Sequence, residues 1–352
     1  PRDHLDLLLA TGEQASAALM AMAIEALGVR AVALAGPRLG IVTESVHGNA
    51  RIRSIDVNRM HAGLRDGAIV VCAGFQGVTA DGAVTTLGRG GSDTTAVAIA
   101  AALGVSDRPD GPAGACEILT DVDGVFTADP RVVPTARRIE RIACEAMVEL
   151  ASLGAGVLHP RAALCAQQYG VPLHVRHSQH DGTGTLVVRE EPAMEREAVV
   201  GCALTRDLAR VGVRGMPNRA GAQGRLFEAI GAADVLVDDI IQNESGGEAD
   251  VAFTIQRAAL ERVESAVAGI LGELGAGRLE RETGLAKVSA VGIGMRTHTG
   301  VASRMFAALG DAGIVIRNIT TSEIKISCLV PSEQAEDALR VVHEAFGLGG
   351  GP

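Results

Sequence analysis

The second half of the chain contains an internal repeat. The segment GMPNRAGAQGRLFEAIGAADVLVDDIIQNE (215–244) aligns without gaps to GMRTHTGVASRMFAALGDAGIVIRNITTSE (294–323). Glycine, methionine, arginine, phenylalanine and glutamate recur at matching places in the two copies. Each copy predicts a strand, a glycine turn, an amphipathic helix and a second strand. Chance rarely aligns this many positions, so the repeat predicts two copies of a small α+β unit.

The first half alternates between helical and strand-like patterns. Apolar residues with helical spacing occur at 13–27, 93–103, 148–153 and 159–169. Short apolar runs that predict strands occur at 31–35, 68–73, 117–120 and 172–175. This alternation predicts an open, largely parallel α/β sheet with helices on both faces. In such sheets ligands bind at the carboxyl ends of the strands.

Composition excludes several classes of function. The net charge of −10 argues against a general nucleic-acid or anionic-membrane partner. The six cysteines are scattered without CxxC spacing, which predicts reduced thiols in a cytoplasmic protein. Lysine occurs only at Lys287 and Lys325. Any phosphate bound by the first half would therefore depend on arginine, a metal ion or helix N-termini.

The stretch LGRGGSDTTAVAIAAALG (87–104) places three glycines, an arginine and an aspartate before a predicted helix. It lacks the lysine of GxxxxGK[ST], and Asp93 takes the third glycine position of GxGxxG. Glycine amides at a helix start still favour anion binding, and Arg89 could hold a carboxylate in bidentate fashion. In the structural alternative, Ser92 or Asp93 simply caps the helix.

A second polar cluster, TDVDGVFTADPR (120–131), directly follows a predicted strand. Thr120, Asp121 and Asp123 would suit a ribose, a phosphate and Mg²⁺ at the end of that strand. The alternative is an Asp- and Gly-rich surface turn. No zinc-type His/Cys cluster is found, and we predict no protein metal site.

Three further segments carry weaker signals. We expect Glu13 in TGEQASAAL to lie at a helix start, where it would either favour the helix dipole or bind a ligand. AGFQGVT (73–79) follows a predicted strand and could line a pocket through Phe75 and Gly77. HGNARI (47–52) is interpreted as a solvated loop, and His159 before a proline as a positional residue.

Taken together, these stretches resemble the bacterial aspartate kinases (aspartokinases) of the amino-acid-kinase fold. The resembling segments are TGEQASAAL, AGFQGVT, LGRGGSDTTAVAIAAALG, TDVDGVFTADPRVVP, ELASLGAGVLHPRA, VGIGMRTHTGVASRMFAAL and TTSEIKIS. The resemblance implies a three-layer αβα domain with a mainly parallel sheet, followed by two α+β ACT (ferredoxin-like) domains. The expected boundaries are 1–190 for the catalytic domain, 191–199 for a linker, and 200–285 and 286–352 for the ACT domains.

The resemblance implies phosphoryl transfer from MgATP to the side-chain carboxylate of L-aspartate, giving 4-phospho-L-aspartate. This is the first step toward lysine, threonine, methionine and diaminopimelate. One alternative is another amino-acid kinase that acts on a different carboxylate or a carbamate. The other is a catalytically impaired aspartokinase-like protein that serves as an amino-acid-sensing regulatory subunit.

The resemblance also implies roles for individual residues. The expected catalytic residues are Arg89, Ser92 and Asp93. The expected aspartate-binding residues are Glu13, Arg89, Phe75 and Gly90. Glu13 would pair with the ammonium group of aspartate, and Arg89 with one of its carboxylates. The expected nucleotide-binding residues are Thr120, Asp121, Phe126, Arg131 and Gly156.

Two departures from the family pattern bear on activity. Family members begin with a KFGGTS-type strand and loop, which is missing before Pro1. We expect an N-terminally truncated chain, and the alternative is a divergent chain that keeps the fold but catalyses poorly. Gly156 stands where the family has a lysine that contacts ATP phosphate. Losing one preorganised cationic donor costs about 3–4 kcal/mol, on the order of 10²–10³ in rate.

The repeats are expected to regulate the kinase. Backbone amides of the turn from Asn218 to Gly221 could receive an amino acid's carboxylate, and Asp239, Gln242 and Asn243 its ammonium group. The resemblance implies feedback inhibition by lysine, threonine or both. It also implies a homodimer or hetero-oligomer that pairs through the ACT domains, and dimerisation alone is the structural alternative.

Overall fold

The computed structural model describes residues 1–105, 114–154, 156–189, 198–275, 277–296 and 298–350. The chain folds into two compact units. Unit 1 comprises Pro1–Phe126 and Arg138–Glu195, and unit 2 comprises Thr127–Arg137 and Arg196–Pro352. Most of the predicted linker 191–199 lies outside the described residues.

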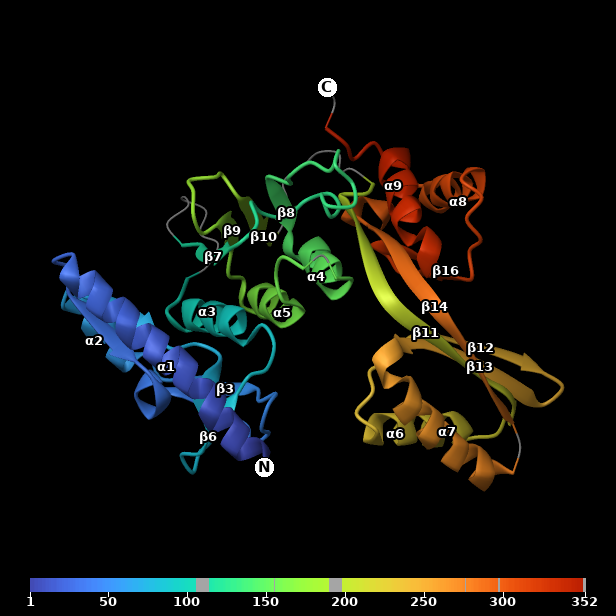
Figure 1. Cartoon of the computed structure of the whole chain (residues 1–352), viewed down its shortest axis with the longest axis horizontal. Helices are drawn as coiled ribbons and strands as arrows, with labels where there is room; N and C mark the ends of the chain where they lie inside the picture. The colour runs from blue at the N-terminus through green and yellow to red at the C-terminus, as the bar shows by residue number, and fades with distance from the viewer. Residues whose placement is uncertain (106–113, 155, 190–197, 276, 297, 351–352) are drawn as a thin grey trace. The chain divides into compact units, whose positions relative to one another are not determined.

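Unit 1 alternates strands and helices along the chain, as its sequence pattern predicts (Figure 1). Its helices are α1 (Arg2–Ala26), α2 (Asn58–Arg65), α3 (Gly91–Ala102), α4 (Cys144–Ser152) and α5 (Pro160–Tyr169), with a short 3-10 helix η1 (Gly36–Leu39). Its strands are β1 (Ala31–Leu34), β2 (Ile41–Thr43), β3 (Ile52–Ile55), β4 (Ile69–Cys72), β5 (Gln76–Val78), β6 (Val84–Thr86), β7 (Cys116–Thr120), β8 (Arg141–Ala143), β9 (Leu173–His177) and β10 (Thr185–Val188).

The described strands of unit 1 form three sheets, with the orders β1-β4, β3-β2-β5-β6 and β7-β9-β10-β8, where the sequence pattern predicted one open sheet. The pairs β1–β4, β2–β5, β7–β9 and β8–β10 are parallel, and the pairs β2–β3, β5–β6 and β9–β10 are antiparallel. Parallel neighbours need a crossover, which the helices supply. Helix α1 packs on β1, β4 and β6, helix α3 packs on β7 and α5, and helix α4 packs on β8 and β10. The α/β class predicted from the sequence is confirmed.

The prediction that Glu13 lies at a helix start is wrong. Helix α1 begins at Arg2, so Glu13 lies near its middle. Residues 2–12 contain no proline, and the one glycine, Gly12, costs a helix interior only about 1 kcal/mol. Buried Asp6 also holds the first turns in place: its carboxylate accepts hydrogen bonds from His47 Nδ1 (2.9 Å), Gly48 N (3.0 Å) and Thr86 Oγ1 (2.6 Å).

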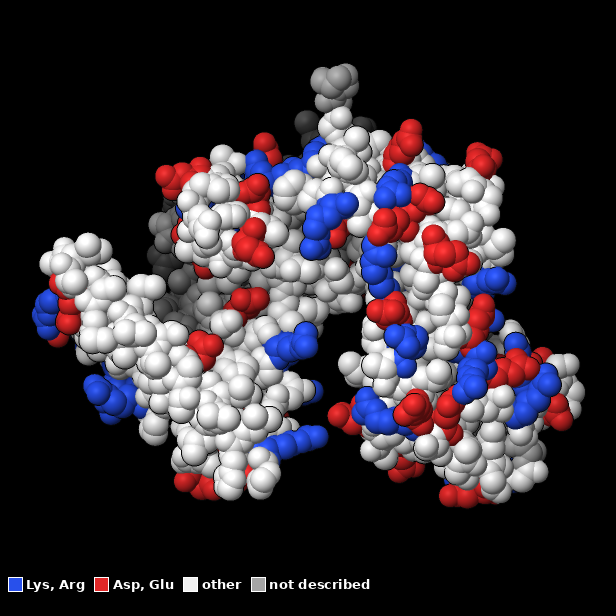
Figure 2. Space-filling view, in the orientation of Figure 1, with Lys and Arg blue, Asp and Glu red and all other residues white. Residues whose placement is uncertain are grey.

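Helix α1 also carries apolar side chains on its exposed side. Leu8, Leu19, Met20 and Met22 are all more than half exposed, and Figure 2 shows a largely uncharged surface along this helix. Length and composition alone would allow α1 to cross a membrane, which is weak evidence because other kinds of helix share both properties. Its buried, hydrogen-bonded Asp6 shows that one side of the helix is docked on unit 1.

Unit 2 is built around one six-stranded sheet with the order β12-β13-β11-β14-β16-β15. Its strands are β11 (Gly201–Pro217), β12 (Asp238–Ser245), β13 (Glu248–Gln256), β14 (Arg278–Val291), β15 (Asn318–Thr321) and β16 (Lys325–Pro331). Its helices are α6 (Ala222–Ala232), α7 (Leu260–Leu274), α8 (Val301–Asp311) and α9 (Ala335–Ala345), with short 3-10 helices η2 (Arg257–Ala259), η3 (Ile293–Arg296) and η4 (Ser332–Gln334). Helices α6 and α7 pack together, and so do α8 and α9 (Figure 1).

The repeat seen in the sequence is present in this fold. Helices α6 and α8 begin and end at the same offset of 79 residues at which the two copies align. Each is preceded by a glycine, Gly221 or Gly300, with φ of 86°. A side chain rarely adopts that conformation, so the glycine turn in each copy has a structural cause. The two copies place their long strands β11 and β14 side by side at the centre of the sheet.

A segment from the first half of the chain belongs to unit 2. Ala128, Val132 and Val133 are buried in the same core as Met305 and Leu339. The backbone of this segment is also bound there, since Cys202 N donates to Thr127 O (2.7 Å). Phe126 and Arg138, which flank the segment, form an antiparallel bridge within unit 1. Residues 127–137 are therefore an excursion of the chain into the core of unit 2.

Candidate active site

The glycine-rich loop ends directly at the N-terminus of α3. Gly88 and Gly90 both have positive φ, 78° and 65°. Gly90 is the N-cap residue and the helix has no side-chain cap, so the interpretation of Ser92 or Asp93 as a mere cap does not hold. A Cβ on Gly90 would lie 2.1 Å from His159 Cγ. Glycine is therefore required at position 90 both by its backbone conformation and by the close approach of His159.

Two of the segments singled out in the sequence meet at this loop. Phe75 N donates a hydrogen bond to Thr95 Oγ1 (3.0 Å), and Leu87 N donates one to Phe75 O (2.9 Å). Phe75 has a positive φ of 67°, which is uncommon for an aromatic residue and marks a constrained turn. A Cβ on Gly91 would lie 2.8 Å from the Phe75 ring. Phe75 and Gly90 therefore lie at one locus, as the predicted aspartate site requires.

The charged side chains at the start of α3 differ in environment. Arg89 is exposed and makes no hydrogen bond or ion pair within the described part of the chain, and Ser92 is also exposed. Asp93 is half-buried. Burial raises the pKa of Asp93, and the backbone amide and ring of His159 oppose that rise. The pKa of His159 is lowered by burial and by the charge of Arg161, whereas Asp93 opposes that shift.

The loop HGNARI has a structural role that the sequence analysis missed. Arg161, on α5, donates to Asn49 Oδ1 (2.9 Å), to Ala50 O (2.9 Å) and to Leu87 O. Asp6 holds the other end of the loop through His47 and Gly48, as described above. Far from being a purely solvated loop, this segment is tied to the strand end that leads into the glycine-rich loop. His159 also has a positional role, because its Nδ1 accepts a hydrogen bond from Arg161 N (3.3 Å).

Helix α1 reaches the AGFQGVT segment next to Glu13. Gln14 Nε2 donates to Gln76 Oε1 (2.8 Å), and Gln76 is fully buried. Gln76 Nε2 has no hydrogen-bond partner within the described residues. Glu13 is half-buried on the same helix turn. The helix that carries the predicted ammonium-binding residue is thus joined to the loop that carries Phe75.

The predicted nucleotide-binding residues are divided between the units. In unit 1, Thr120 is the last residue of β7, and its hydroxyl donates a hydrogen bond to Asp121 Oδ1 (3.1 Å). The side chain of Asp121 is exposed, and that of Phe126 is half-buried. Arg131 lies in unit 2, where its guanidinium binds Asp129 through two contacts of 3.0 and 2.8 Å.

Gly156 is exposed in unit 1. It has φ of +70°, and only Gly154 O comes within 4 Å of a Cβ built on it, at 3.8 Å. There is consequently space for a longer side chain at this position, although the backbone conformation favours glycine. That residues 88–93 and 120–131 line one cleft stays a prediction.

Three of the predicted effector-binding residues lie on strand β12, on both of its faces, and the other two, Asn218 and Gly221, precede α6. Asp239, Ile241 and Asn243 alternate along one face and line a cavity of about 170 Å³. Gln242 points to the opposite face, where Gln223 Nε2 donates to Gln242 Oε1 and to Asn218 Oδ1, both at 3.2 Å. Gln223 therefore joins two predicted residues, and the sequence analysis missed it because it lies inside α6.

Asp239 is already occupied by a cation from the same chain. Lys287 is buried in β14, and its ammonium group binds Asp238 and Asp239, with Lys287 Nζ 3.1 Å from Asp239 Oδ2. Asp239 also accepts a hydrogen bond from Thr254 Oγ1 (3.1 Å). The pKa of Lys287 is raised: burial opposes the charged form, but the two carboxylates outweigh it. An effector's ammonium group would have to compete with Lys287 for Asp239.

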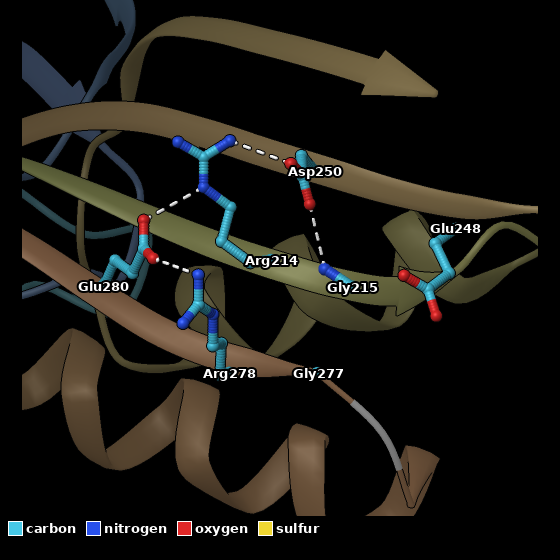
Figure 3. Close-up of a pocket in the computed structure, with 7 residues that line it drawn as sticks. All are labelled: Arg214, Gly215, Glu248, Asp250, Gly277, Arg278 and Glu280. Carbon is cyan, nitrogen blue, oxygen red and sulfur yellow. Dashed lines mark hydrogen bonds and ion pairs between the residues drawn. The ribbon is translucent and has the colours of Figure 1, made fainter. Parts of the chain in front are cut away.

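A larger charged cavity of about 630 Å³ lies beside β11, β13 and β14 (Figure 3). Arg214 lies between two carboxylates there, with Nη1 2.9 Å from Asp250 Oδ2 and Nε 3.0 Å from Glu280 Oε2. Arg278 binds the second oxygen of Glu280 (2.8 Å), and Gly215 N donates to Asp250 (2.9 Å). The charged groups of these side chains are largely paired with one another. None of these residues was predicted as a site residue.

Comparison with known proteins shows the class of protein to which this chain belongs. Residues 2–177 match the amino acid kinase family, and residues 288–346 match an ACT domain. The class is thus a protein with an amino-acid-kinase domain followed by an ACT domain. Over 350 residues the chain is 46% identical to an aspartate kinase of Pseudomonas putida, covering 99% of this chain and 83% of that protein. The chain belongs to the aspartokinase family.

Solved structures support the same assignment. The chain is similar to E. coli aspartokinase III in complex with aspartate and ADP (R-state), with a TM-score of 0.78 and 30% identity over 98% of this chain and 76% of that one. It is also similar to the same enzyme in complex with lysine and aspartate (T-state), with a TM-score of 0.73, 29% identity and the same coverage. The predicted family and fold class are confirmed, and a non-catalytic amino-acid sensor is not favoured.

Proposed function

We propose that this chain transfers the γ-phosphoryl group of ATP to the side-chain carboxylate of L-aspartate. The observation that carries this proposal is the junction of the AGFQGVT segment with the N-terminus of α3, where Arg89 is exposed and Asp93 half-buried. The similarity to E. coli aspartokinase III, which was solved with aspartate and ADP, supports it. The product is 4-phospho-L-aspartate, which would enter lysine, threonine, methionine and diaminopimelate synthesis in the cytoplasm.

Residues from three segments would hold the substrate. The planar guanidinium of Arg89 suits one carboxylate of aspartate in bidentate fashion, and Glu13 suits its ammonium group. Phe75 and Gly90 would form the wall and floor of this pocket, because their backbones are tied to α3. Ser92 and Asp93, in the first turn of α3, would order the reacting carboxylate and the groups around it.

The nucleotide would lie at the carboxyl end of β7. Thr120 and Asp121 are polar groups at that end, and Phe126 offers an aromatic face. The exposed carboxylate of Asp121 is the kind of oxygen ligand that Mg²⁺ prefers. Arg131 and Gly156 complete the proposed set, Gly156 through its backbone. Bound MgATP would supply the phosphoryl group, and its bond to ADP would break as the bond to aspartate forms.

Formation of aspartyl hydroxamate from ATP, aspartate and hydroxylamine tests the proposed function. We expect activity with aspartate and none above background with glutamate. Arg89→Ala should raise the KM for aspartate about tenfold or more, since it removes a charge-assisted contact worth roughly 1.5–3 kcal/mol. Arg59→Ala, at an exposed position on α2, is the matched control and should behave as the wild type. Equal effects of the two substitutions would contradict the role of Arg89.

We also propose that unit 2 regulates the kinase by binding an amino acid. The similarity to the lysine complex of E. coli aspartokinase III supports lysine as one candidate, and threonine is the other. Asn218, Gly221 and Gln242 would contact the effector on the α6 side of β12, and Asp239 and Asn243 on the other face. Calorimetric titration of the chain with each amino acid tests this. Binding of neither would contradict it.

The domain division and the assembly complete the proposal. We propose a catalytic domain over 1–190, a linker over 191–199, and ACT domains over 200–285 and 286–352 that pair two chains into a homodimer or join a second subunit. Sedimentation equilibrium measures the assembly directly. A monomer at all concentrations, with and without effector, would contradict pairing through the ACT domains.

A further inference from the structure

Three side chains outside the proposed active site converge where β7 and β9 end. Asp123 follows β7, His177 is the last residue of β9, and His180 lies in the loop beyond it. One ligand atom from each residue lies within 4.8 Å of the other two. The sequence pattern links Asp123 to a ribose, a phosphate or Mg²⁺ and contains no zinc-type His/Cys cluster, since Asp123 is far along the chain from the two histidines. Only the parallel pairing of β7 with β9 brings them together.

Backbone hydrogen bonds hold this arrangement in place. Thr120 lies opposite His177 in the parallel ladder, and Ser178 N donates to Thr120 O (2.8 Å), so the chain leaving β9 stays beside the chain leaving β7. Gly182 N donates to His180 O (3.0 Å) and closes a tight turn. This turn brings the His180 ring back over His177: the ring centroids are 4.2 Å apart and the planes differ by 13°.

Two of the three ligand atoms are spaced nearly as a metal ion would require, and the third, on His177, lies within 4.8 Å of both. His180 Nε2 lies 2.8 Å from Asp123 Oδ1, in an ion-pair contact that is close enough for the two atoms to share a proton. Two ligands on one tetrahedral Zn²⁺ lie about 3.3 Å apart, given bonds of about 2.0–2.1 Å. A displacement of roughly half an ångström would therefore admit the ion between Asp123 and His180. The His177 ring would also have to turn out of its stack with His180 to aim a nitrogen at the ion.

We propose that Asp123, His177 and His180 bind a transition-metal dication such as Zn²⁺. Two imidazoles and one carboxylate suit Zn²⁺, Co²⁺ or Ni²⁺, whereas Mg²⁺ and Ca²⁺ prefer oxygen ligands alone. The side chains of Asp123 and His180 are 52% and 53% exposed, so the ion enters directly from solvent. Three protein ligands leave a coordination position for water.

The bound ion would cross-link the loop after β7 to the loop after β9. Asp123 lies two residues beyond Asp121, which we place at the nucleotide, so the cross-link would restrain the nucleotide-binding segment. Metal binding itself does not depend on that function. The site is also distinct from the Mg²⁺ that accompanies ATP, because it requires imidazole nitrogen.

Titration of the full chain with ZnCl₂ in a calorimeter, and with Co²⁺ by its visible d–d absorption, tests the site in the absence of nucleotide. We expect one equivalent to bind. His177→Ala and His180→Ala should each lower the affinity at least about tenfold, and Asp123→Asn should lower it as well. His174→Ala is the matched control on the same strand, because His174 Nε2 instead contacts Thr183 O (2.8 Å), and it should keep the wild-type affinity.

Hydrogen exchange supplies a second readout that does not rely on activity. Zn²⁺ should slow amide exchange at 178–182 in the wild type and leave it unchanged in the double variant His177→Ala/His180→Ala. Wild-type exchange elsewhere would show that the double variant is folded. Unchanged Zn²⁺ affinity in that variant, or displacement of bound Co²⁺ by a modest excess of Mg²⁺, would overturn the proposal.

Discussion

Thr127 and His343 are joined by a hydrogen bond of 2.9 Å between Thr127 Oγ1 and His343 Nε2, although 216 positions separate them in sequence. Both side chains are 1% exposed. The same hydroxyl donates to Leu348 O (3.1 Å) and accepts from Arg137 N (3.1 Å). Because Thr127 directly follows Phe126, the chain that leaves the proposed nucleotide segment is anchored at once in the core of unit 2.

Thr127→Val should destabilise unit 2 by about 1–3 kcal/mol, because it keeps the shape of the side chain but leaves buried partners without a hydrogen bond. Hydrogen exchange of peptides from α9 measures this loss. Thr299→Val, at an exposed threonine of the same unit, is the control and should change stability by less than about 0.5 kcal/mol. Equal protection of α9 in both variants would show that the buried hydroxyl contributes nothing.

The buried His343 should make unit 2 sensitive to acid. Burial lowers the pKa of His343, and the charge of Arg137 lowers it further. The unfolded chain therefore binds a proton near pH 6.5 that the folded unit takes up only at lower pH, so stability falls as the pH drops below about 6.5. We expect His343→Gln to reduce the loss of stability between pH 7 and pH 5, whereas exposed His4→Gln should not. A pH dependence identical in all three proteins would refute this origin.

Gly90→Ala should abolish most of the kinase activity. Its backbone has φ of 65°, and the added methyl group would lie within 2.2 Å of two His159 carbon atoms. Displacing α3 or His159 by even 1 Å from the substrate site costs on the order of 10²-fold in kcat/KM. Gly82→Ala is the control: it has φ of 90° but no heavy atom within 4 Å of the new Cβ, so it reports backbone strain alone. Similar losses in both variants would exclude the contact with His159 as the cause.

Asp6→Asn should destabilise unit 1 by about 1–3 kcal/mol, since the amide cannot accept from His47, Gly48 and Thr86 as the carboxylate does. Burial alone would raise the pKa of Asp6, but these hydrogen bonds outweigh it and lower that pKa. Urea unfolding followed by fluorescence reports unit 1 selectively, because Tyr169 is the one tyrosine and the chain has no tryptophan. Asp3→Asn, on the exposed side of α1, should leave the midpoint unchanged.

Much of the fold could be predicted from local pattern. The apolar runs at 68–73 and 117–120 correspond to β4 and β7, and the predicted helix 93–103 corresponds to α3 within two residues. The repeat predicted α6 and α8 because its glycine turns and helix spacing recur at one offset. These are properties of short segments, which periodicity and turn residues determine directly.

What local pattern could not predict depends on distant contacts. Nothing within the segment 127–137 indicates that it packs in unit 2, because its partners, His343 and Leu339, lie more than two hundred positions away. Glu13 was misplaced because a charged residue in an otherwise apolar run resembles a helix start. The interaction of Lys287 with Asp239 was likewise invisible, since strands β12 and β14 are brought together only by the sheet.

Acyl-phosphate formation is the most direct test of the proposed function, and ³¹P NMR observes it in a mixture of the chain, MgATP and aspartate. We predict that ADP and a new acyl-phosphate resonance appear in equal amounts, that both require aspartate, and that hydroxylamine removes the new resonance. Release of inorganic phosphate without an acyl-phosphate signal, or an equal signal with glutamate in place of aspartate, would contradict the proposed function.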